Sequence, residues 1–90
     1  MSVRRVLYEV EEERVRQDAK WGQQNHGPGN WFLILMEEVG EAGTSAQERD
    51  WKNYRTELVQ ATAVLVAMIE CLDRHVPGII NATNAERTGS

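Results

Sequence analysis

The chain has little of what stabilises secreted proteins or lets a protein cross a membrane. Its 90 residues include a single cysteine, Cys71, which has no partner for an internal disulfide. The most apolar stretch, residues 58–72, contains Gln, Thr and Glu and is too short and too polar for a membrane span. The first residues lead into an amphipathic pattern without a signal peptide. We therefore expect a cytoplasmic protein without a membrane partner.

The sequence also lacks internal repeats, low-complexity tracts and the alternating pattern of a β-strand. Basic residues are in the minority, 10 against 14 acidic residues, and the net charge is −4. Nucleic-acid polymers and anionic membranes require concentrated Lys and Arg, so this charge balance argues against both as partners. A phosphate-bearing small molecule remains compatible with it if a divalent cation mediates binding.

Hydrophobic periodicity predicts three helices, over residues 3–20, about 31–47 and about 51–74. Asn30 is the expected N-cap of the second helix and Asp50 that of the third. Residues 21–30 contain three glycines and one proline and are expected to form a loop. The prediction is one all-α domain over residues 1–90, with a frayed tail at about residues 84–90.

The third predicted helix is apolar on nearly all sides. Leu58, Leu65 and Leu72 form one line along it, and Val59 and Val66 form another. Two other short helices are too few to cover both lines. The expected fold class is therefore an all-α bundle of three main helices that is completed by oligomerisation, as a homodimer or a homotetramer.

Three carboxylates crowd the second predicted helix, where Glu37, Glu38 and Glu41 share an arc of roughly 100°. Glu38 projects inside the apolar stripe of this helix and Glu41 lies at its edge. The residues of that stripe are Trp31, Ile34, Leu35, Val39, Ala42 and Ala46. Burying an unpaired carboxylate costs several kcal/mol or shifts its pKa. A cation is therefore expected beside these glutamates.

Two glycines, Gly40 and Gly43, lie in the same predicted helix. Each costs about 0.5–1 kcal/mol relative to alanine in a helix. Their presence predicts that another backbone or a ligand approaches this helix closely.

The third predicted helix supplies Glu57 and Gln60, one turn apart and on an otherwise apolar side. Two helices that carry Glu38, Glu41, Glu57 and Gln60 can point four oxygen ligands into one gap. Oxygen ligands select hard cations, so the expected cofactor is Mg2+, with Mn2+ as the substitute.

Other chemistries are less well supported by the sequence. A ferritin-like di-iron site needs Glu-x-x-His pairs, and neither His26 nor His75 has a glutamate three positions before it. No Ser or Cys stands in a recognisable nucleophile elbow, and the glycine-rich loop lacks the Gly-Lys-Ser/Thr of a P-loop.

The first predicted helix turns from apolar to polar along one face. Val3, Val6 and Val10 are followed there by Glu13, Arg14 and Gln17, which point toward Lys20 and Trp21. By this placement, Arg14 and Lys20 are candidate phosphate partners. The neighbouring Glu11 and Glu12 are expected to be solvated charges, and His26 taken alone is an ordinary loop histidine.

These residues together resemble the MazG-like all-α nucleoside triphosphate pyrophosphohydrolases, over about residues 10–75. The hallmark of that family is Glu-Glu-x-x-Glu, followed some dozen to thirty residues later by Glu-x-x-Asp. The matching segments here are Lys20-Trp21-Gly22, His26, Trp31, Glu37-Glu38-Val39-Gly40-Glu41 and Glu57-Leu58-Val59-Gln60.

The resemblance implies roles for individual residues. Glu38, Glu41 and Glu57 would bind Mg2+, with Glu37 as an additional ligand or a base. Trp21 and His26 match the positions where relatives contact the nucleobase and sugar. The full set of expected substrate-binding residues is Arg14, Gln17, Lys20, Trp21, His26 and Trp31; the expected catalytic residues are Glu37 and Glu38.

One position departs from the family pattern, because Gln60 stands where the family usually has Asp. An amide still offers its carbonyl oxygen to a metal but removes one negative charge, which should weaken metal affinity or shift substrate preference. The expected reaction is Mg2+-dependent hydrolysis of a nucleoside triphosphate to monophosphate and pyrophosphate, with a deoxy or non-standard nucleotide as the expected substrate in a housecleaning role. The alternative is a non-catalytic helical oligomer that binds nucleotide or a protein partner.

Overall fold

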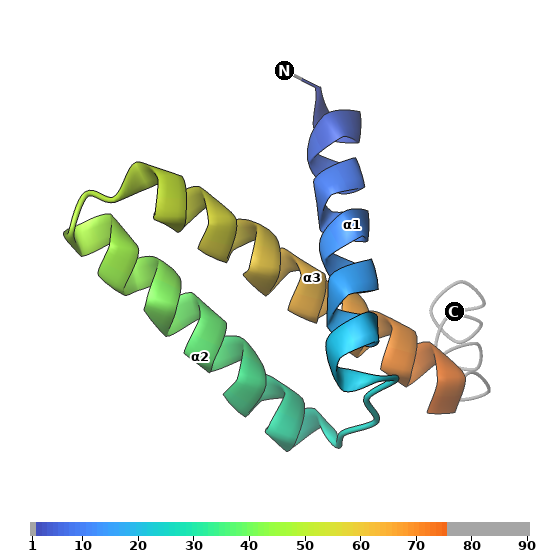
Figure 1. Cartoon of the computed structure of the whole chain (residues 1–90). Helices are drawn as coiled ribbons and strands as arrows, with labels where there is room; N and C mark the ends of the chain where they lie inside the picture. Colours follow the sequence, from blue (N-terminus) through green and yellow to red (C-terminus); the bar gives the residue numbers. More distant parts are fainter. Residues whose placement is uncertain (1, 76–90) are drawn as a thin grey trace, which may run out of the picture.

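Three helices make up the part of the chain that the computed structural model describes, residues 2–75. They are α1 (Val3–Trp21), α2 (Pro28–Gln47) and α3 (Trp51–His75), and no strand occurs between them. α2 and α3 form an antiparallel hairpin, and α1 runs across α3 (Figure 1). The all-α class is thus confirmed, whereas the predicted frayed tail at 84–90 lies outside the described residues.

The ends of α1 and α3 agree with the predicted helix boundaries. Ser2 caps α1 by accepting a hydrogen bond from the Arg5 amide at 3.3 Å, and Gly22, at φ 73°, ends the helix in a backbone conformation that favours glycine. Asp50 caps α3, because its Oδ1 accepts from the Asn53 amide at 3.2 Å. The prediction for Asp50 is confirmed.

The predicted start of α2 is wrong. Asn30 lies within the helix, which begins at Pro28 with Gly27 as the N-cap residue. The physical reason is that proline has its φ already fixed near the helical value and lacks only an N–H that the first turn leaves unpaired. The loop therefore shrinks from ten residues to the segment 22–27.

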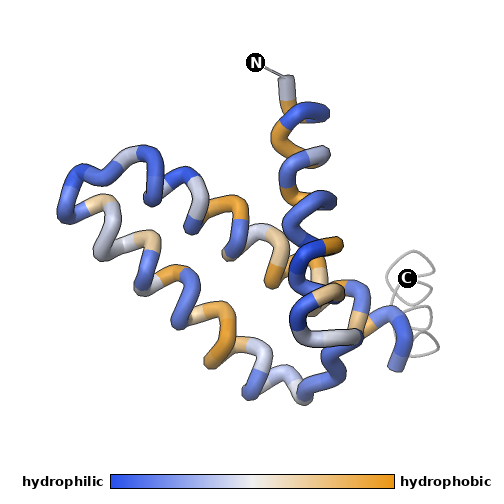
Figure 2. Tube along the Cα trace, viewed as in Figure 1, coloured by the Kyte–Doolittle hydropathy of each residue, from blue (hydrophilic) through white to orange (hydrophobic). Residues whose placement is uncertain are grey.

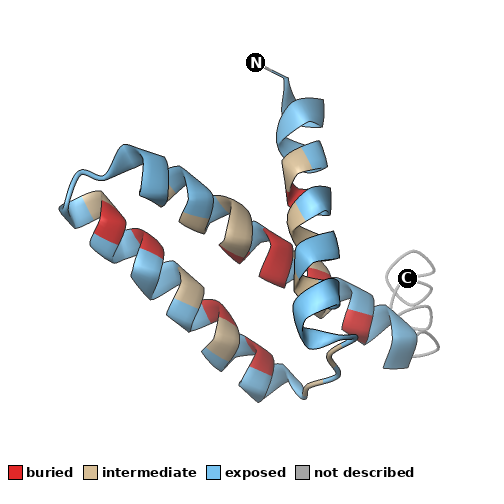
Figure 3. Cartoon of the chain, in the orientation of Figure 1, coloured by how far each residue is buried: buried red, intermediate tan, exposed pale blue. Residues whose placement is uncertain are grey.

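The core lies between α2 and α3, with one buried contribution from α1, Val10 (Figure 3). Trp31 and Leu35 from α2 meet a face of α3 that consists largely of small residues, Ala61, Val64, Ala67 and Cys71. Small side chains let two helices approach closely and leave the large indole to fill the gap. Trp31, 4% exposed, is therefore the main anchor of the hairpin.

Two ion pairs fasten α1 to α3. Arg55 binds Glu9 through two hydrogen bonds of 2.7 Å each, and Arg14 Nη2 lies 2.8 Å from Glu70 Oε1. Two-pronged pairing of a guanidinium with a carboxylate also fixes the relative orientation of two helices. These contacts set where the polar residues of α1 lie over the hairpin.

The two apolar lines of α3 have different environments. Leu58, Leu65 and Leu72 are 43%, 45% and 48% exposed, whereas Val59 and Val66 are half-buried. Within residues 2–75, one of the two apolar lines is therefore left uncovered, and it is the leucine line. Apolar segments follow the middle of α2 and α3 in Figure 2. No helix within residues 2–75 has the length and apolar character to cross a membrane.

The glycines of α2 are open on the outside. A Cβ atom at Gly40 or Gly43 would meet no heavy atom within 4 Å. The prediction of a close backbone approach is therefore wrong for contacts inside the described chain. The other part of that prediction, the approach of a ligand or of another molecule to these glycines, stays a prediction. Val39, assigned to the buried stripe, is also exposed, because it points about 90° away from the side that faces α3.

Candidate metal centre

Three glutamates from two helices converge at one point of the hairpin. Glu38 and Glu41 of α2 and Glu57 of α3 each offer a carboxylate oxygen, and these oxygens all lie within 4.8 Å of one another. Among the described residues this is the only cluster of three carboxylate, imidazole or thiolate side chains close enough to hold a metal ion. The predicted grouping of these three residues is present.

The register of the hairpin brings the glutamates together. α2 and α3 are joined by a three-residue connection, and the buried Ser45 accepts a hydrogen bond of 2.6 Å from Asn53 Nδ2 across it. Counting back along α2 and forward along α3 from this link places Glu38 and Glu41 opposite Glu57. Residues three apart on a helix lie on one side, so both ends of the predicted motif face the same gap.

Partial burial and mutual repulsion disturb the ionisation of the cluster. Burial is the main cause that raises the pKa of Glu57 to about 7. Its hydrogen bonds to Glu41 and Glu38, and the repulsion by their charges, also raise this pKa. Burial also raises the pKa of Glu38, followed by repulsion from Glu41, while a hydrogen bond to Glu57 opposes the rise. Without a cation, Glu57, with a pKa of about 7, is therefore partly protonated at neutral pH.

Gln60 belongs to the same cluster. With its amide nitrogen turned toward the carboxylates, it donates to Glu57 Oε2 at 3.0 Å and to Glu38 Oε2 at 3.3 Å. Rotation of the amide by half a turn presents its carbonyl oxygen to the same gap. Gln60 is therefore placed either to satisfy the glutamates or to join them as an oxygen ligand.

The donor set fits a hard divalent cation. It consists of carboxylate oxygens from Glu38, Glu41 and Glu57, with an amide oxygen available from Gln60, and contains no sulfur or imidazole. Such a set suits Mg2+ or Mn2+, which retain waters that a substrate phosphate can replace. A cation would also remove the repulsion that raises the pKa of Glu57.

Two further acidic residues lie near the cluster without belonging to it. The charges of Glu37 and of Glu13 on α1 both contribute to the raised pKa of Glu38. Glu37 is exposed, while Glu13 is half-buried and accepts a hydrogen bond of 2.8 Å from Arg16 Nε. Glu37, predicted as a ligand or base, thus stands at the edge of the cluster.

The basic residues predicted for phosphate binding have protein partners. Arg14 pairs with Glu70 at 2.8 Å and Asp18 at 3.1 Å, and donates to Gln17 Oε1 at 3.2 Å. Its side chain is 14% exposed, so it acts first as the link between α1 and α3. The sequence did not predict Glu70 as this partner, because Glu70 lies 56 residues from Arg14 along the chain and no local pattern links the two.

Lys20 and Trp21 lie at the exposed end of α1. The Lys20 ammonium stands 4.7 Å from the centroid of the Trp21 ring, and Trp21 is 60% exposed. This is a cation–π pair at the surface. Neither residue lines the cavities described for residues 2–75, so the structure leaves both apart from the other predicted substrate residues.

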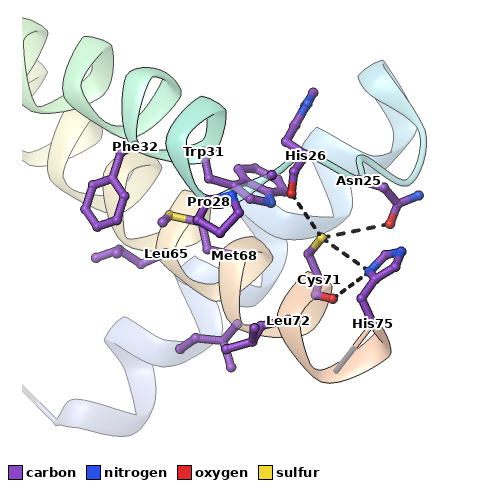
Figure 4. Close-up of a pocket in the computed structure, with 12 residues that line it drawn as sticks. Asn25, His26, Pro28, Trp31, Phe32, Leu65, Met68, Cys71, Leu72 and His75 are labelled. Atoms are coloured by element: carbon purple, nitrogen blue, oxygen red, sulfur yellow. Dashed lines mark hydrogen bonds between the residues drawn. The ribbon is translucent and has the colours of Figure 1, made fainter. Parts of the chain in front are cut away.

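His26 and Trp31 lie together at a separate cavity of about 650 Å3 between the loop 22–27, α2 and α3 (Figure 4). Their rings make an edge-to-face contact with centroids 4.8 Å apart. His26 Nε2 and Trp31 Nε1 are both buried and have no hydrogen-bond partner among the described residues. Trp31 is thus both a core residue and part of a cavity wall, and the three clustered glutamates do not line this cavity.

The cavity also contains residues that sequence reasoning did not assign to a site. Cys71 Sγ lies 3.8 Å from the His26 carbonyl oxygen and 3.7 Å from His75 Nδ1, and that nitrogen is 2.8 Å from the Cys71 carbonyl oxygen. Asn25 accepts a hydrogen bond of 3.0 Å from Arg74. The sequence could have indicated that Cys71 faces α2, because it lies two heptads after Glu57 on the same side of α3.

Comparisons with known proteins add no relative. A scan against models of protein families, a search of curated proteins and a search of solved structures each return no match. The assignment of a function therefore depends on the residues and their geometry.

Proposed function

We propose that this chain is a divalent-metal-dependent nucleoside triphosphate pyrophosphohydrolase of the MazG-like type, which acts as a homo-oligomer. The observation that carries the proposal is the convergence of Glu38, Glu41 and Glu57 with oxygens within 4.8 Å. The two halves of the motif that resembles this family lie on different helices, and they meet in space. A purely solvated arrangement of acidic residues would give no reason for half-burying Glu38 and Glu57 beside one another.

The reaction transfers the nucleotidyl group, the nucleoside with its α-phosphate, to water. Water attacks the α-phosphorus, the bond to the bridging oxygen breaks, and monophosphate and pyrophosphate leave. Glu38, Glu41 and Glu57 would hold Mg2+ or Mn2+, which when bound neutralises phosphate charge and makes a water more acidic. Glu37, which is exposed beside the cluster, would take the proton of the attacking water.

The cavity beside His26 and Trp31 is the part of the chain suited to an uncharged ring. Its walls carry no acidic, lysine or arginine side chain, and most of the residues that line it are apolar or aromatic.

Hydrolysis can be tested directly by measuring pyrophosphate release from a panel of standard, deoxy and modified nucleoside triphosphates with Mg2+ or Mn2+. The proposal expects turnover of at least one triphosphate, and its loss in EDTA. Glu41→Gln should abolish turnover, whereas the exposed Glu48→Gln, outside the cluster, should not. Turnover that survives Glu38→Gln and Glu41→Gln would contradict the proposal.

A second candidate function is a non-catalytic helical oligomer that binds nucleotide or a protein. The observation that favours it is Gln60, which can satisfy Glu57 and Glu38 without a metal ion. This candidate expects no turnover of any nucleotide. It is distinguished by nucleotide binding, measured calorimetrically, that does not depend on Mg2+.

A further inference from the structure

The cavity at the end of α3 has an apolar mouth that stays open within residues 2–75. This is the cavity of about 650 Å3 that Cys71 and His75 line at one end (Figure 4). Three residues of its wall, Phe32, Ile69 and Leu72, are 55%, 59% and 48% exposed. Apolar surface of this kind is unfavourable in water, and where it is contiguous it commonly marks a binding surface.

The chain leaves the described part of the structure beside this mouth. α3 ends at His75, and both His75 and Leu72, in the last turn of the helix, belong to the cavity wall. The sequence continues with Val76-Pro77-Gly78-Ile79-Ile80. These five residues are therefore tethered directly beside the mouth.

The order of these five residues favours a reversal of the chain. Proline disfavours a helical conformation of the residue before it, so the helix is not expected to continue through Val76. Proline followed by glycine is typical of the two central residues of a type II turn. A turn over residues 76–79 directs Ile79 and Ile80 back toward the last turn of α3.

Ile79 and Ile80 share the apolar character of the mouth. The residues after them, 81–90, include no large apolar side chain. An extended residue advances about 3.3 Å and a helical one about 1.5 Å, so two residues after the turn return to the level of the last turn of α3. A segment joined to the wall by a few residues also has an effective concentration on the order of millimolar, which favours it over a separate molecule.

We infer that the apolar mouth of the cavity binds residues 76–80 of the same chain, with the two isoleucines packed against Leu72 and Ile69. The segment then shields the thiol of Cys71 from solvent. The uncharged ring that we propose for this cavity would compete with the isoleucines for the same wall. That consequence rests on the proposed function, whereas the binding of the segment does not.

Labelling of Cys71 with a small maleimide, without nucleotide or metal, tests the inference independently of hydrolysis. Cys71 is the single cysteine of the chain, so the labelling rate reports one position. Ile79→Asp with Ile80→Asp should raise this rate about tenfold or more, because two carboxylates do not stay on an apolar wall. Ala82→Asp with Ala85→Asp is the matched control, which adds the same charge beyond the isoleucines and should leave the rate unchanged.

Circular dichroism should show the same helix content in the wild type and in both variants, so that a faster rate is not the result of unfolding. An equal labelling rate in the wild type and in the isoleucine variant would overturn the inference.

A disulfide experiment shows which chain the segment covers. In Ile80→Cys, Cys71 is the second thiol, and oxidation with diamide should join the two within one chain much faster than in Ala85→Cys. The product should keep the single-chain mass of 10.3 kDa. Equal rates at the two positions, or a product of twice that mass, would contradict binding by the same chain.

Discussion

The side-chain amide of Gln60 on α3 lies 3.3 Å from Glu38 Oε2 on α2. This contact joins the one position that departs from the resembled family to the most central of the metal-ligand candidates. With its nitrogen turned toward the carboxylates, the amide donates to Glu38 and Glu57 at a place that also suits a positive charge. How the cluster responds to a metal ion, to pH and to a change at Gln60 follows from that arrangement.

Divalent metal should stabilise the folded chain. Mg2+ or Mn2+ that binds the native glutamates and not the unfolded chain adds about 2.7 kcal/mol at a hundred times its dissociation constant. The melting temperature should rise as metal concentration rises, and Glu38→Gln with Glu41→Gln should remove that rise. Identical melting in EDTA and in millimolar Mg2+ would leave the ligand assignment without support.

Gln60→Asp should change stability in opposite directions with and without metal. In EDTA, a fourth carboxylate beside Glu38, Glu41 and Glu57 adds repulsion, and the substitution also removes the amide donor, at a cost of about 1–3 kcal/mol. With Mg2+, the added charge should tighten metal binding and recover stability. Thermal melts of both proteins under both conditions measure this, and uniform destabilisation would place Gln60 outside the metal shell.

The raised pKa of Glu57 predicts a pH dependence of stability in the absence of metal. A carboxyl group whose pKa is raised from 4.5 to about 7 holds a proton in the folded state that it loses in the unfolded state. Its favourable contribution is complete below pH 4.5 and is lost as the pH rises through 7. In EDTA, the free energy of unfolding should therefore fall between pH 5 and 8.

Two controls separate this effect from other titrations. Glu57→Gln should flatten the decline between those pH values, because the neutral amide has no proton to lose. Saturating Mg2+ should also oppose the decline, since metal binds the deprotonated carboxylates. A decline of the same size in Glu57→Gln would assign it to another group.

The open glycines predict a simple stability difference. Gly40→Ala should raise the free energy of unfolding by about 0.5–1 kcal/mol, because helix propensity improves and the new Cβ meets no heavy atom within 4 Å. Gly22→Ala is the contrasting control: space is equally open there, but φ is +73°, so it should destabilise by about 1 kcal/mol. Urea denaturation measures both. A loss of stability in Gly40→Ala would mean that another molecule approaches α2 there.

Local residues were enough to predict the three helices and the residues of the cluster. Periodicity placed α1 and α3 to within a residue at each end, and the cap at Asp50 followed from its side chain. The start of α2 was misplaced, because Pro28 and Gly29 were assigned to a loop. Glycine and proline permit both a loop and a first helical turn, so these residue types do not by themselves fix where α2 begins.

The sequence by itself determined which side chains point the same way along each helix, because that depends on 3.6 residues per turn and nothing further. The sequence was therefore enough to predict the helices, the grouping of Glu38 with Glu41, and the grouping of Glu57 with Gln60. Only the tertiary structure decided which faces meet. The hairpin register put Glu41 beside Glu57, α1 bound Arg14 to Glu70, and Leu65 rather than Val66 was left exposed. These outcomes depend on how helices far apart in sequence pack together, and that is a property of the whole molecule.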